Sequence, residues 1–590
     1  MKRSLKMLKN VRTVYCGQVD EKYLNKQINL CGWVNRRRDL GQLIFVDLRD
    51  RTGIMQIVFD PKDSDQATEL AHKLRSEFVV AVAGEVVKRS QPNEKISTGL
   101  FELKVKELKI LSESKTPPFP IDDDSNVDEE LRLKYRYLDL RRSRMQELTK
   151  LRNNTIFAVR EYLQNLEFYE IETPILAKST PEGARDFLVP SRLHTGTFYA
   201  LPQSPQVFKQ LLMCAEMDKY FQIARCFRDE DFRSNRQPEF TQLDMEMSFI
   251  SEQDIQNICE GLICHVWQKI LGKKISAPFK RMTYEQAFNE YGCDKPDLRF
   301  DMSIKDLTKI FEKIDLKFLK TVIDNDGKIG AIKIDNKNFS RSEIDKWTQK
   351  TKDFGCGGLV VLKFKDDNSV DSSIAKFLPK DFFSQLKTVF KNLTNKDTIF
   401  IVADQFKKAW DVLGRLRLEL AKELNLINQD EFNFAWITDF PLLEWNEQDK
   451  RFYATHHPFT SPQKDWQNLK PEEIKARAYD LVCNGEELGG GSIRIHDAKT
   501  QLKVFNLLGI DEKIAKEQFG FLLEAQEYGF PPHGGLAFGI DRLIMILGKT
   551  NSISDVITFP KTTKGKDLMT DSPAIVDEKQ LKDLHIKIVK

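Results

Sequence analysis

The chain has 590 residues, 41% of them hydrophobic and 30% charged, and its 91 Lys and Arg nearly balance 88 Asp and Glu. This profile is typical of a multidomain globular protein, and the formal net charge of +3 identifies no partner by itself. The nine cysteines form no CxxC pair, so neither a zinc ribbon nor a disulfide framework is indicated. Free thiols, a basic N-terminus without an apolar h-region and the lack of a membrane-length apolar stretch predict a cytoplasmic protein.

The first hundred residues read as short strands separated by turn residues. We expect strands at 28–36, 43–50, 53–60, 78–87 and 100–110, with a helix at 67–75. Five strands with a helix between the third and fourth are typical of an OB-fold barrel. We therefore assign residues 1–116 to an N-terminal OB-fold β-barrel.

One strand of this barrel carries an aromatic residue on its polar side. Alternation places apolar residues 44, 46 and 48 on one face and Phe45, Asp47 and Arg49 on the other. An aromatic near the arginines at 36–38 is the pattern that stacks an unpaired base while guanidinium groups hold phosphates. The alternative is a barrel aromatic packed under a loop beside solvated arginines.

Past the barrel, the composition indicates a hinge and then a second domain. Residues 117–144 begin with prolines and continue into an acidic run, as expected of a hinge. From Met145 the apolar spacing is helical, and a strand-like segment ending at Pro174 follows. Residues 145–297 mix helices and strands and form the first part of that domain.

A lysine-rich segment interrupts the second domain. Residues 298–430 contain expected strands at 359–364 and 398–403 and a helix at 405–424, so they indicate an inserted α/β domain. Residues 431–560 return to strands punctuated by glycine, and 561–590 form a basic C-terminal extension.

Two arginines far apart in the sequence suggest a polyphosphate clamp. Residues 534–542 (GGLAFGIDR) read as a strand of small residues entering an apolar helix, with Arg542 in its first turn, where free N–H groups favour an anion. Arg228 and Glu230 lie two residues apart, so a strand places both on one face. An arginine binds two phosphate oxygens, and a carboxylate accepts from an adenine amino group. The alternatives are a surface arginine at a strand–helix junction and a charged hairpin with internal ion pairs.

A glycine-rich hairpin brings two carboxylates together. Asn484-Gly485 is a strong hairpin signal, so Asp480 and Glu487 are expected to approach each other from paired strands. Paired carboxylates beside phosphates suit Mg²⁺, which takes hard oxygen ligands. Arg494 follows the glycine run and is placed to bind a carboxylate. The alternative is a glycine bulge with an exposed arginine.

Further polar side chains extend this set. A helix opening near Gln206 offers that amide close to the ammonium of Lys209. His456 and His457 follow a strand, and neighbouring residues of a strand point to opposite faces, so we expect one to donate a hydrogen bond to a substrate. A structural histidine is the alternative.

These segments together resemble the class II aminoacyl-tRNA synthetases, specifically the bacterial-type aspartyl-tRNA synthetases. The stretch ending at Pro174 is similar to the first signature of the class, residues 227–230 (FRDE) to the second and residues 539–542 (GIDR) to the third. The resemblance covers the whole chain. It implies an α+β multidomain fold with an OB-fold β-barrel that binds the anticodon, an antiparallel-sheet catalytic domain, and the inserted domain of bacterial members.

The resemblance implies that the chain activates L-aspartate with ATP and transfers it to tRNA-Asp as a homodimer. Its implied nucleotide-binding residues are Arg228, Asp229, Glu230, Gln237, Glu487, Gly539, Ile540, Asp541 and Arg542, with Arg228 and Arg542 catalytic and Asp480 and Glu487 holding Mg²⁺ through ATP. Its implied aspartate-binding residues are Glu182, Gln206, Lys209, Arg228, Asp244, His456 and Arg494. Its implied anticodon-binding residues are Arg38, Leu40, Phe45 and Gln56.

Three other functions stay open at this level. A non-discriminating enzyme would also charge tRNA-Asn, although Leu40 resembles members restricted to tRNA-Asp. An asparaginyl- or lysyl-type enzyme would leave the cations Arg494 and Lys209 without a substrate carboxylate. A catalytically silent RNA-binding relative would have no need of two phosphate-binding arginines.

Overall fold

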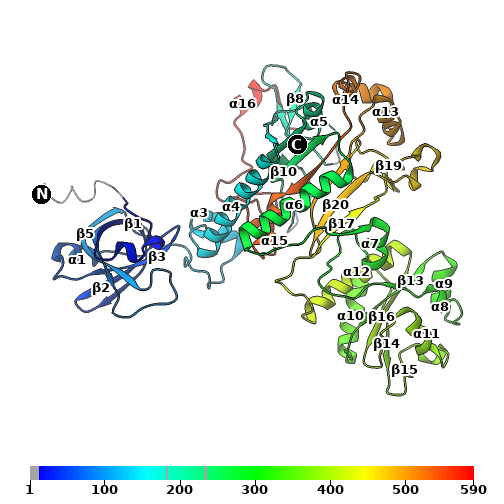
Figure 1. The fold of residues 1–590 in the computed structure, drawn as a ribbon, viewed down its shortest axis with the longest axis horizontal. Coiled ribbons are helices and arrows are strands. Elements are labelled where there is room, and N and C mark those ends of the chain that lie inside the picture. The colour runs from blue at the N-terminus through cyan, green and yellow to red at the C-terminus, as the bar shows by residue number, and fades with distance from the viewer. Residues whose placement is uncertain (1–11, 181–183, 231–234, 590) are drawn as a thin grey trace. The chain divides into compact units, whose positions relative to one another are not determined.

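The computed structural model describes residues 12–180, 184–230 and 235–589. Its contacts divide the chain into two compact units, Met1–Arg152 with Ser554–Ile575, and Asn153–Ile553 with Val576–Lys590 (Figure 1). Among the described residues, no helix combines the length and the apolarity that crossing a membrane requires.

The first unit contains the expected five-stranded closed barrel, in the order β1-β2-β3-β5-β4. Its elements are β1 Gln27–Leu40, β2 Leu43–Asp50, β3 Gly53–Phe59, α1 Asp65–Ala71, β4 Val79–Lys88 and β5 Phe101–Ser112. β1 runs four residues further than expected because it forms a tight hairpin with β2, in which Leu40 pairs with Leu43. α1 begins and ends before the expected 67–75, since the Ser64 side chain caps its first turn.

The alternation expected for β2 is confirmed, with one difference. Ile44, Val46 and Leu48 are fully buried in the barrel core, whereas Phe45 and Asp47 are partly exposed. Arg49 is buried, because both oxygens of Glu77 accept hydrogen bonds from its guanidinium at 2.8 Å.

After the barrel come α2 Glu129–Lys134, α3 Arg136–Asp139 and α4 Ser143–Asn165. Residues 554–575 return to this unit because the buried Arg136 guanidinium donates to the carbonyls of Ser554, Ile557 and Thr558 at 2.9–3.2 Å. One boundary between the compact units falls after Ile553.

The second unit is built on an eight-stranded sheet, in the order β11-β17-β20-β21-β22-β10-β9-β6, antiparallel except for the pairs β11–β17 and β6–β9. Its strands are β6 Tyr169–Glu170, β9 Lys219–Phe227, β10 Glu239–Ser248, β11 Lys280–Thr283, β17 Phe434–Thr438, β20 Ala478–Cys483, β21 Glu486–Ile493 and β22 His533–Gly539. Two small hairpins pair β7 Leu188–Pro190 with β8 Phe198–Ala200, and β18 Leu443–Asn446 with β19 Arg451–Ala454. β6 is shorter than expected because it pairs only with β9, at the edge of the sheet.

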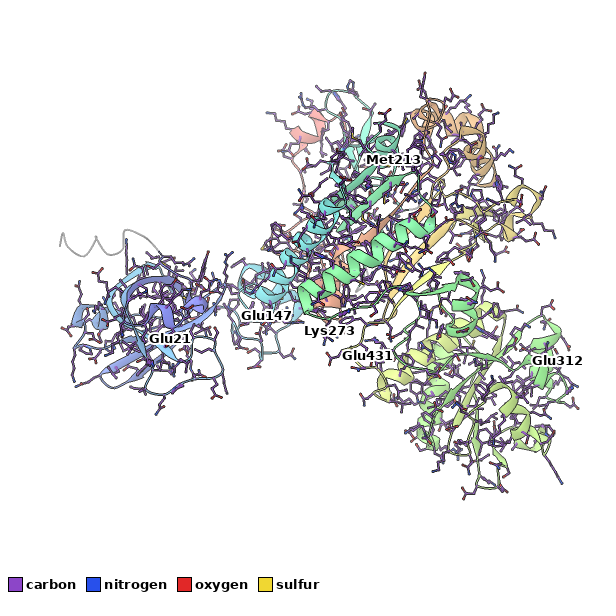
Figure 2. All side chains as sticks on the ribbon, in the orientation of Figure 1. Glu21, Glu147, Met213, Lys273, Glu312 and Glu431 are labelled. Atoms are coloured by element: carbon purple, nitrogen blue, oxygen red, sulfur yellow. The ribbon has the colours of Figure 1, made fainter. Side chains whose placement is uncertain are left out.

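Helices cover this sheet. They are α5 Gln206–Cys214, α6 Glu252–Leu271, α7 Tyr284–Tyr291, α13 Ala498–Leu507, α14 Glu512–Ala525 and α15 Ile540–Leu547, and α16 Glu578–Asp583 lies in the C-terminal segment. α5 carries Met213, which Figure 2 labels. Its sulfur lies 3.2 Å from the hydroxyl oxygen of Ser248 on β10, so the helix that carries Gln206 and Lys209 contacts the sheet.

The inserted segment has a sheet of its own, in the order β12-β13-β16-β14-β15 and antiparallel throughout. Its elements are β12 Lys305–Asp306, α8 Thr308–Phe311, α9 Lys317–Asp324, β13 Lys328–Ile334, α10 Arg341–Asp353, β14 Val360–Phe364, β15 Val370–Asp371, α11 Phe382–Val389, β16 Thr398–Asp404 and α12 Phe406–Glu423. Separate apolar clusters cover the two faces of this sheet, one with α10 and α12 and the other with α9 and α11.

Candidate active site

The polar side chains of the site lie in two rows across the eight-stranded sheet. The strand register aligns Asp244, Ala537, Gly490 and Asp480 across β10, β22, β21 and β20. Two residues along, it aligns Glu246, Gly535 and Ser492. Because partners in an antiparallel ladder share a face, both rows point to the same side of the sheet.

The glycines between these carboxylates leave the space that the carboxylates occupy. A Cβ added to Gly490 would lie 2.4 Å from Asp480 Oδ1, and one added to Gly535 would lie 2.1 Å from Glu246 Oε2. A side chain at Gly490 would displace the Asp480 carboxylate, and one at Gly535 would meet the Met245 main-chain oxygen at 2.0 Å as well as Glu246. The glycine run is therefore required by the packing of the site as well as by access of a ligand to the backbone.

Four buried charged side chains contact one another beside these two rows. Lys209 Nζ lies 2.7 Å from Asp244 Oδ1 and 3.2 Å from Glu246 Oε2. The Arg494 guanidinium donates to both oxygens of Glu246, at 2.8 and 3.1 Å. All four side chains are at most 2% exposed. A buried charge is stable only when it is paired, so each carboxylate holds a cation in place.

The electrostatics of the two carboxylates differ. Burial by itself would raise the pKa of Glu246, but the charges of Arg494 and Lys209 outweigh it and lower this pKa to about 2. Burial raises the pKa of Asp244 above its usual value, although the Lys209 charge opposes the shift. Glu246 is therefore ionised at neutral pH and is the firmer partner of the two cations.

Two polar atoms next to this cluster lack partners. Among the described residues, Asp244 Oδ2 and Gln206 Nε2 are buried without a hydrogen-bond partner. Gln206 precedes Lys209 by one turn on α5, and both side chains are buried. An acceptor and a donor left buried and unpaired indicate a place where a ligand supplies the missing bonds.

The two neighbouring histidines contact different groups. His456 Nε2 lies 3.2 Å from Asp480 Oδ1, and Asp480 raises the pKa of His456 against the lowering effect of burial. His457 contacts the Arg494 guanidinium through Nε2, and burial together with that charge holds its pKa well below the usual value. His457 is therefore neutral and orients Arg494, whereas His456 is available to a substrate.

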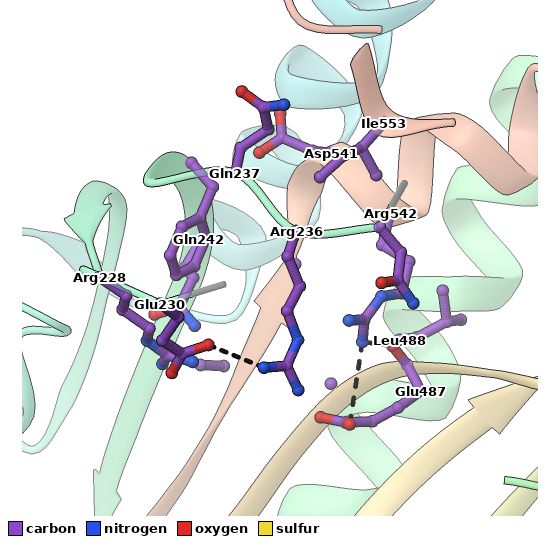
Figure 3. A pocket seen from close by; sticks show the side chains of 15 residues that line it. Arg228, Glu230, Arg236, Gln237, Gln242, Glu487, Leu488, Asp541, Arg542 and Ile553 are labelled. Carbon is purple, nitrogen blue, oxygen red and sulfur yellow. Dashed lines mark hydrogen bonds and ion pairs between the residues drawn. The ribbon is translucent and has the colours of Figure 1, made fainter. Parts of the chain in front are cut away.

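A cavity of about 220 Å³ opens beside the first row and ends at α15. It is lined by Arg228, Glu230, Asn235, Arg236, Gln237, Phe240, Gln242, Glu487, Leu488, Gly489, Ala537, Gly539, Asp541, Arg542 and Ile553. Figure 3 shows Arg228 and Arg542 on opposite sides of this cavity, which is the arrangement expected of the clamp. Seven of the nine predicted nucleotide-binding residues line it.

The partners of the two arginines fix their positions in the cavity. The Arg228 guanidinium carbon lies 5.1 Å from the centre of the Phe240 ring, and its Nε is buried without a partner among the described residues. The Arg542 guanidinium donates to the main-chain oxygen of Glu487 and lies 3.8 Å from its carboxylate. Arg236 pairs with Glu230 at 2.9 Å (Figure 3).

Two predicted nucleotide-binding residues do not line the cavity. The main chain of Asp229 pairs with Arg185, and its carboxylate lies 3.8 Å from the Arg185 Nε. Ile540 is fully buried at the start of α15. Asp541 does line the cavity, but its carboxylate accepts a hydrogen bond from the Thr241 amide at 2.9 Å and so ties α15 to β10.

The paired carboxylates predicted on the hairpin are close in the structure. A Cβ on Gly490 would lie within 3.6 Å of oxygens from both Asp480 and Glu487. Burial and the charge of Asp480 raise the pKa of Glu487. Two adjacent carboxylates that repel each other, one of them lining this cavity, fit a divalent cation, which would relieve that repulsion.

The predicted nucleic-acid residues gather on one side of the barrel. Arg38 donates to Asp47 and to the Gln56 amide oxygen at 3.0 Å, and its guanidinium carbon lies 6.0 Å from the centre of the Phe45 ring. Leu40 is 68% exposed at the hairpin tip. Gln56 is buried and donates to Glu102, so of these four residues it is the most firmly held.

One predicted aspartate-binding residue, Glu182, lies in the segment 181–183, which is outside the described residues.

The sequence did not indicate several other residues of the site. The missed residues are Arg236, Phe240, Gln242, Glu246 and Ser492. Glu246 had a readable signal, because it follows Asp244 by two residues on one strand and therefore shares its face.

Comparisons with known proteins agree with this geometry. A family model described as "tRNA synthetases class II (D, K and N)" matches residues 128–563, and one described as "OB-fold nucleic acid binding domain" matches residues 28–111. The chain is 51% identical to the aspartate--tRNA ligase of Clostridium tetani, over the full length of both chains. It is 50% identical to the aspartate--tRNA(Asp/Asn) ligase of Desulfatibacillum aliphaticivorans, over 98% of each.

Solved structures show the same fold at low sequence identity. The asparaginyl-tRNA synthetase from Pyrococcus horikoshii complexed with asparaginyl-adenylate aligns with a TM-score of 0.59 and 20% identity, over 93% of this chain and 98% of that one. A putative aspartyl-tRNA synthetase from Leishmania major aligns with a TM-score of 0.58 and 19% identity, over 93% of each chain. The barrel, the antiparallel sheet and the match over residues 128–563 therefore show that the chain belongs to the class II tRNA synthetase family.

Proposed function

We propose that the chain is an aspartate–tRNA ligase, which activates L-aspartate with ATP and then transfers it to the 3′ end of tRNA-Asp. The observation that carries the proposal is a buried cluster of two cations and two carboxylates beside a cavity flanked by two arginines, on one sheet. The curated relatives at about 51% identity over the whole chain carry the same activity in their names.

The buried pocket suits the side chain of aspartate. Lys209 and Arg494 present only N–H donors, so a carboxylate, which only accepts, satisfies them. The NH₂ group of an asparagine side chain would face the N–H donors of Lys209 and Arg494 without an acceptor between them, and a buried site discriminates strongly against such a substrate. The sequence led us to expect that the two cations would have no other partner, but Glu246 and Asp244 already balance their charges. Selectivity for aspartate over asparagine therefore depends on the orientation of the N–H donors of Lys209 and Arg494 more than on the net charge of the cluster.

The rest of the amino acid has candidate partners too. The unpaired Asp244 Oδ2 would accept a hydrogen bond from the α-ammonium, and Glu182 remains a predicted second acceptor. Gln206 Nε2 and His456 supply further donors to the substrate. Arg228, at the end of the cavity, would hold the α-carboxylate and the α-phosphate close to each other.

ATP occupies the cavity in this proposal. Phe240 offers a flat apolar surface to the adenine, with Glu230 as acceptor for its amino group, and Arg542 holds the γ-phosphate of a bent triphosphate. Asp480 and Glu487 would hold Mg²⁺, which supplies charge neutralisation on the phosphates. The α-carboxylate attacks the α-phosphorus, pyrophosphate leaves, and Arg228 and Arg542 stabilise the developing charge.

The barrel would bind the anticodon. Phe45 is partly exposed on the face that carries Arg38 and Gln56, which suits the stacking of an unpaired base beside a guanidinium group. Asp229, Gly539, Ile540 and Asp541 would support the nucleotide site through the main chain and through α15.

A cytoplasmic homodimer is the proposed state. β6 is an edge strand, and large apolar side chains on it and on the segments before and after it in the sequence are exposed: Phe157, Tyr169, Ile175, Leu176, Leu188 and Phe198. An edge strand with an apolar border favours pairing with a second copy. Each of the nine cysteines is free, as expected in a reducing compartment.

A non-discriminating enzyme is the second candidate. Two relatives at 50–51% identity are named aspartate--tRNA(Asp/Asn) ligases, so overall similarity does not separate the two functions. Leu40 at the exposed hairpin tip favours restriction to tRNA-Asp. Charging of a purified tRNA-Asn transcript at a rate near that of tRNA-Asp would establish the broader function.

ATP–pyrophosphate exchange tests the proposal. We expect exchange that depends on aspartate and is at least about a hundredfold slower with asparagine or lysine. Faster exchange with either of these amino acids would refute the pocket assignment. Absence of exchange with all three would leave an RNA-binding protein without the proposed activity.

A further inference from the structure

A second groove, separate from the substrate sites, lies where the inserted segment meets the catalytic sheet. It has a volume of about 250 Å³, and α7, α12 and the segments around Pro441 and Ile474 enclose it. Figure 1 shows α7 and α12 next to each other at this junction. No residue lining the nucleotide cavity lines this groove.

The walls of the groove are aromatic. Tyr284 and Phe288 on α7 have nearly parallel rings, 17° apart, and the Phe406 ring of α12 lies edge-on to Phe288 at 5.6 Å. Pro441 and Ile474 complete the apolar surface. Such walls receive methylene groups and attract organic cations through the faces of the rings.

The border of the groove is acidic. Four carboxylates line it (Glu285, Asp439, Glu472 and Glu473), against the two ammonium groups of Lys407 and Lys475. Lys407 already lies 3.3 Å from Glu444 Oε1, outside this set. Within the described ranges, Glu285 and Glu472 form no ion pair and both are exposed, so their charges are available to a ligand.

Aromatic walls with carboxylates at the border suit a ligand of one chemistry. We propose that this groove binds a linear alkyl diammonium ion, with its methylene chain against Tyr284, Phe288 and Phe406 and its ammonium groups at Glu285 and Glu472, and that occupancy tightens the aspartate site. A neutral chain would leave the carboxylates unpaired, and a compact metal ion would leave the aromatic walls exposed.

One aromatic ring connects the groove to the active site. The Phe440 ring, next to the lining residue Pro441, lies 5.3 Å from Tyr284 and 4.7 Å from His456. His456 in turn contacts Asp480 at 3.2 Å. A ligand against Tyr284 restricts Phe440, which restricts the His456 ring, so the bound state favours the arrangement that receives aspartate.

Calorimetric titration of the full chain, without tRNA, tests the binding. The ligands are 1,5-diaminopentane, pentylamine and 1,5-pentanediol. We expect saturable binding of the diamine, weaker binding of the monoamine and none of the diol. The double variant Glu285→Gln/Glu472→Gln should weaken diamine binding about fivefold or more, because it removes two partly exposed ion pairs. Glu578→Gln, an exposed carboxylate of α16 outside the groove, is the matched control and should bind as the wild type does.

A second titration tests the link to the active site. Aspartate should bind about two- to threefold more tightly when the diamine is saturating, and the double variant should lose this difference. This readout rests on the proposed function, so a chain that binds no aspartate at all would refute that function and not the groove. No saturable diamine binding, equal binding by the double variant, or unchanged aspartate affinity would each overturn the proposal.

Discussion

Replacing Gly490 with alanine tests the pairing of Asp480 and Glu487 more sharply than removing either carboxylate. The added Cβ would lie 2.4 Å from Asp480 Oδ1, well inside van der Waals contact, and its closest contacts are all with these two side chains. The Asp480 carboxylate therefore has to move by roughly 1 Å. A shift of that size alters the 3.2 Å contact between Asp480 and His456 and the position of Asp480 relative to Glu487.

The size of the effect follows from this displacement. A 1 Å misplacement of a positioned group costs about a hundredfold in rate, or about 2.7 kcal/mol. We therefore expect Gly490→Ala to slow aspartate-dependent ATP–pyrophosphate exchange about a hundredfold and to raise the Mg²⁺ concentration needed for half-maximal rate. The backbone at Gly490 is not in the left-handed region, so an alanine causes no backbone strain there.

Gly520→Ala is the matched control for this experiment. Gly520 lies on α14, and a Cβ there would meet no atom within 4 Å. The control should exchange at the wild-type rate. If Gly490→Ala also exchanged within about threefold of wild type, the placement of Asp480 and Glu487 at the reacting phosphates would be wrong.

Three further predictions follow from the same geometry. Arg542→Ala should slow ATP–pyrophosphate exchange by orders of magnitude and leave the affinity for tRNA nearly unchanged. Phe45→Ala should weaken tRNA binding by about 1–3 kcal/mol and leave the exchange rate unchanged. Equal effects of both changes in both assays would contradict this division of roles. Glu246→Gln leaves Lys209 and Arg494 with one buried carboxylate between them. The variant should have a higher KM for aspartate and a free energy of unfolding that is lower by about 3 kcal/mol. An unchanged melting temperature would argue against the buried pairing. Burial and the charge of Asp480 raise the pKa of Glu487, so this carboxylate takes up a proton at a higher pH than an ordinary glutamate does. The exchange rate should therefore fall as the solution is acidified, and this fall should shift to lower pH at higher Mg²⁺ concentration, because the cation competes with the proton. A fall that does not depend on Mg²⁺ would exclude Glu487 as its cause.

Much of the fold was readable because local signals and tertiary pairing agree. The five barrel strands have alternating patterns and turn residues, and the structure pairs all five in a closed barrel. The predicted bounds of an element were less accurate where its pairing in the folded sheet differs from what the local sequence pattern indicates. The segment at 169–174 looks like a strand, yet only Tyr169 and Glu170 pair, at the edge of the sheet.

The candidate site was partly readable for a similar reason. Arg228, Arg542, Asp480 and Glu487 lie beside turn or glycine signals, and the structure gathers them at one cavity and its border. The spacing to Asp244 puts Glu246 on the same face, but the sequence does not show that this glutamate is buried and paired, because its partners lie far away in the chain. Those partners are Lys209, 37 positions before it, and Arg494, 248 positions after it.

Charging of a tRNA-Asp transcript with radiolabelled amino acids tests the proposed activity most directly. We expect ATP-dependent attachment of aspartate to the transcript, with asparagine and lysine at background, and loss of attachment in Arg228→Ala. Attachment of asparagine or lysine in preference to aspartate, or attachment of aspartate that survives Arg228→Ala at full rate, would contradict it.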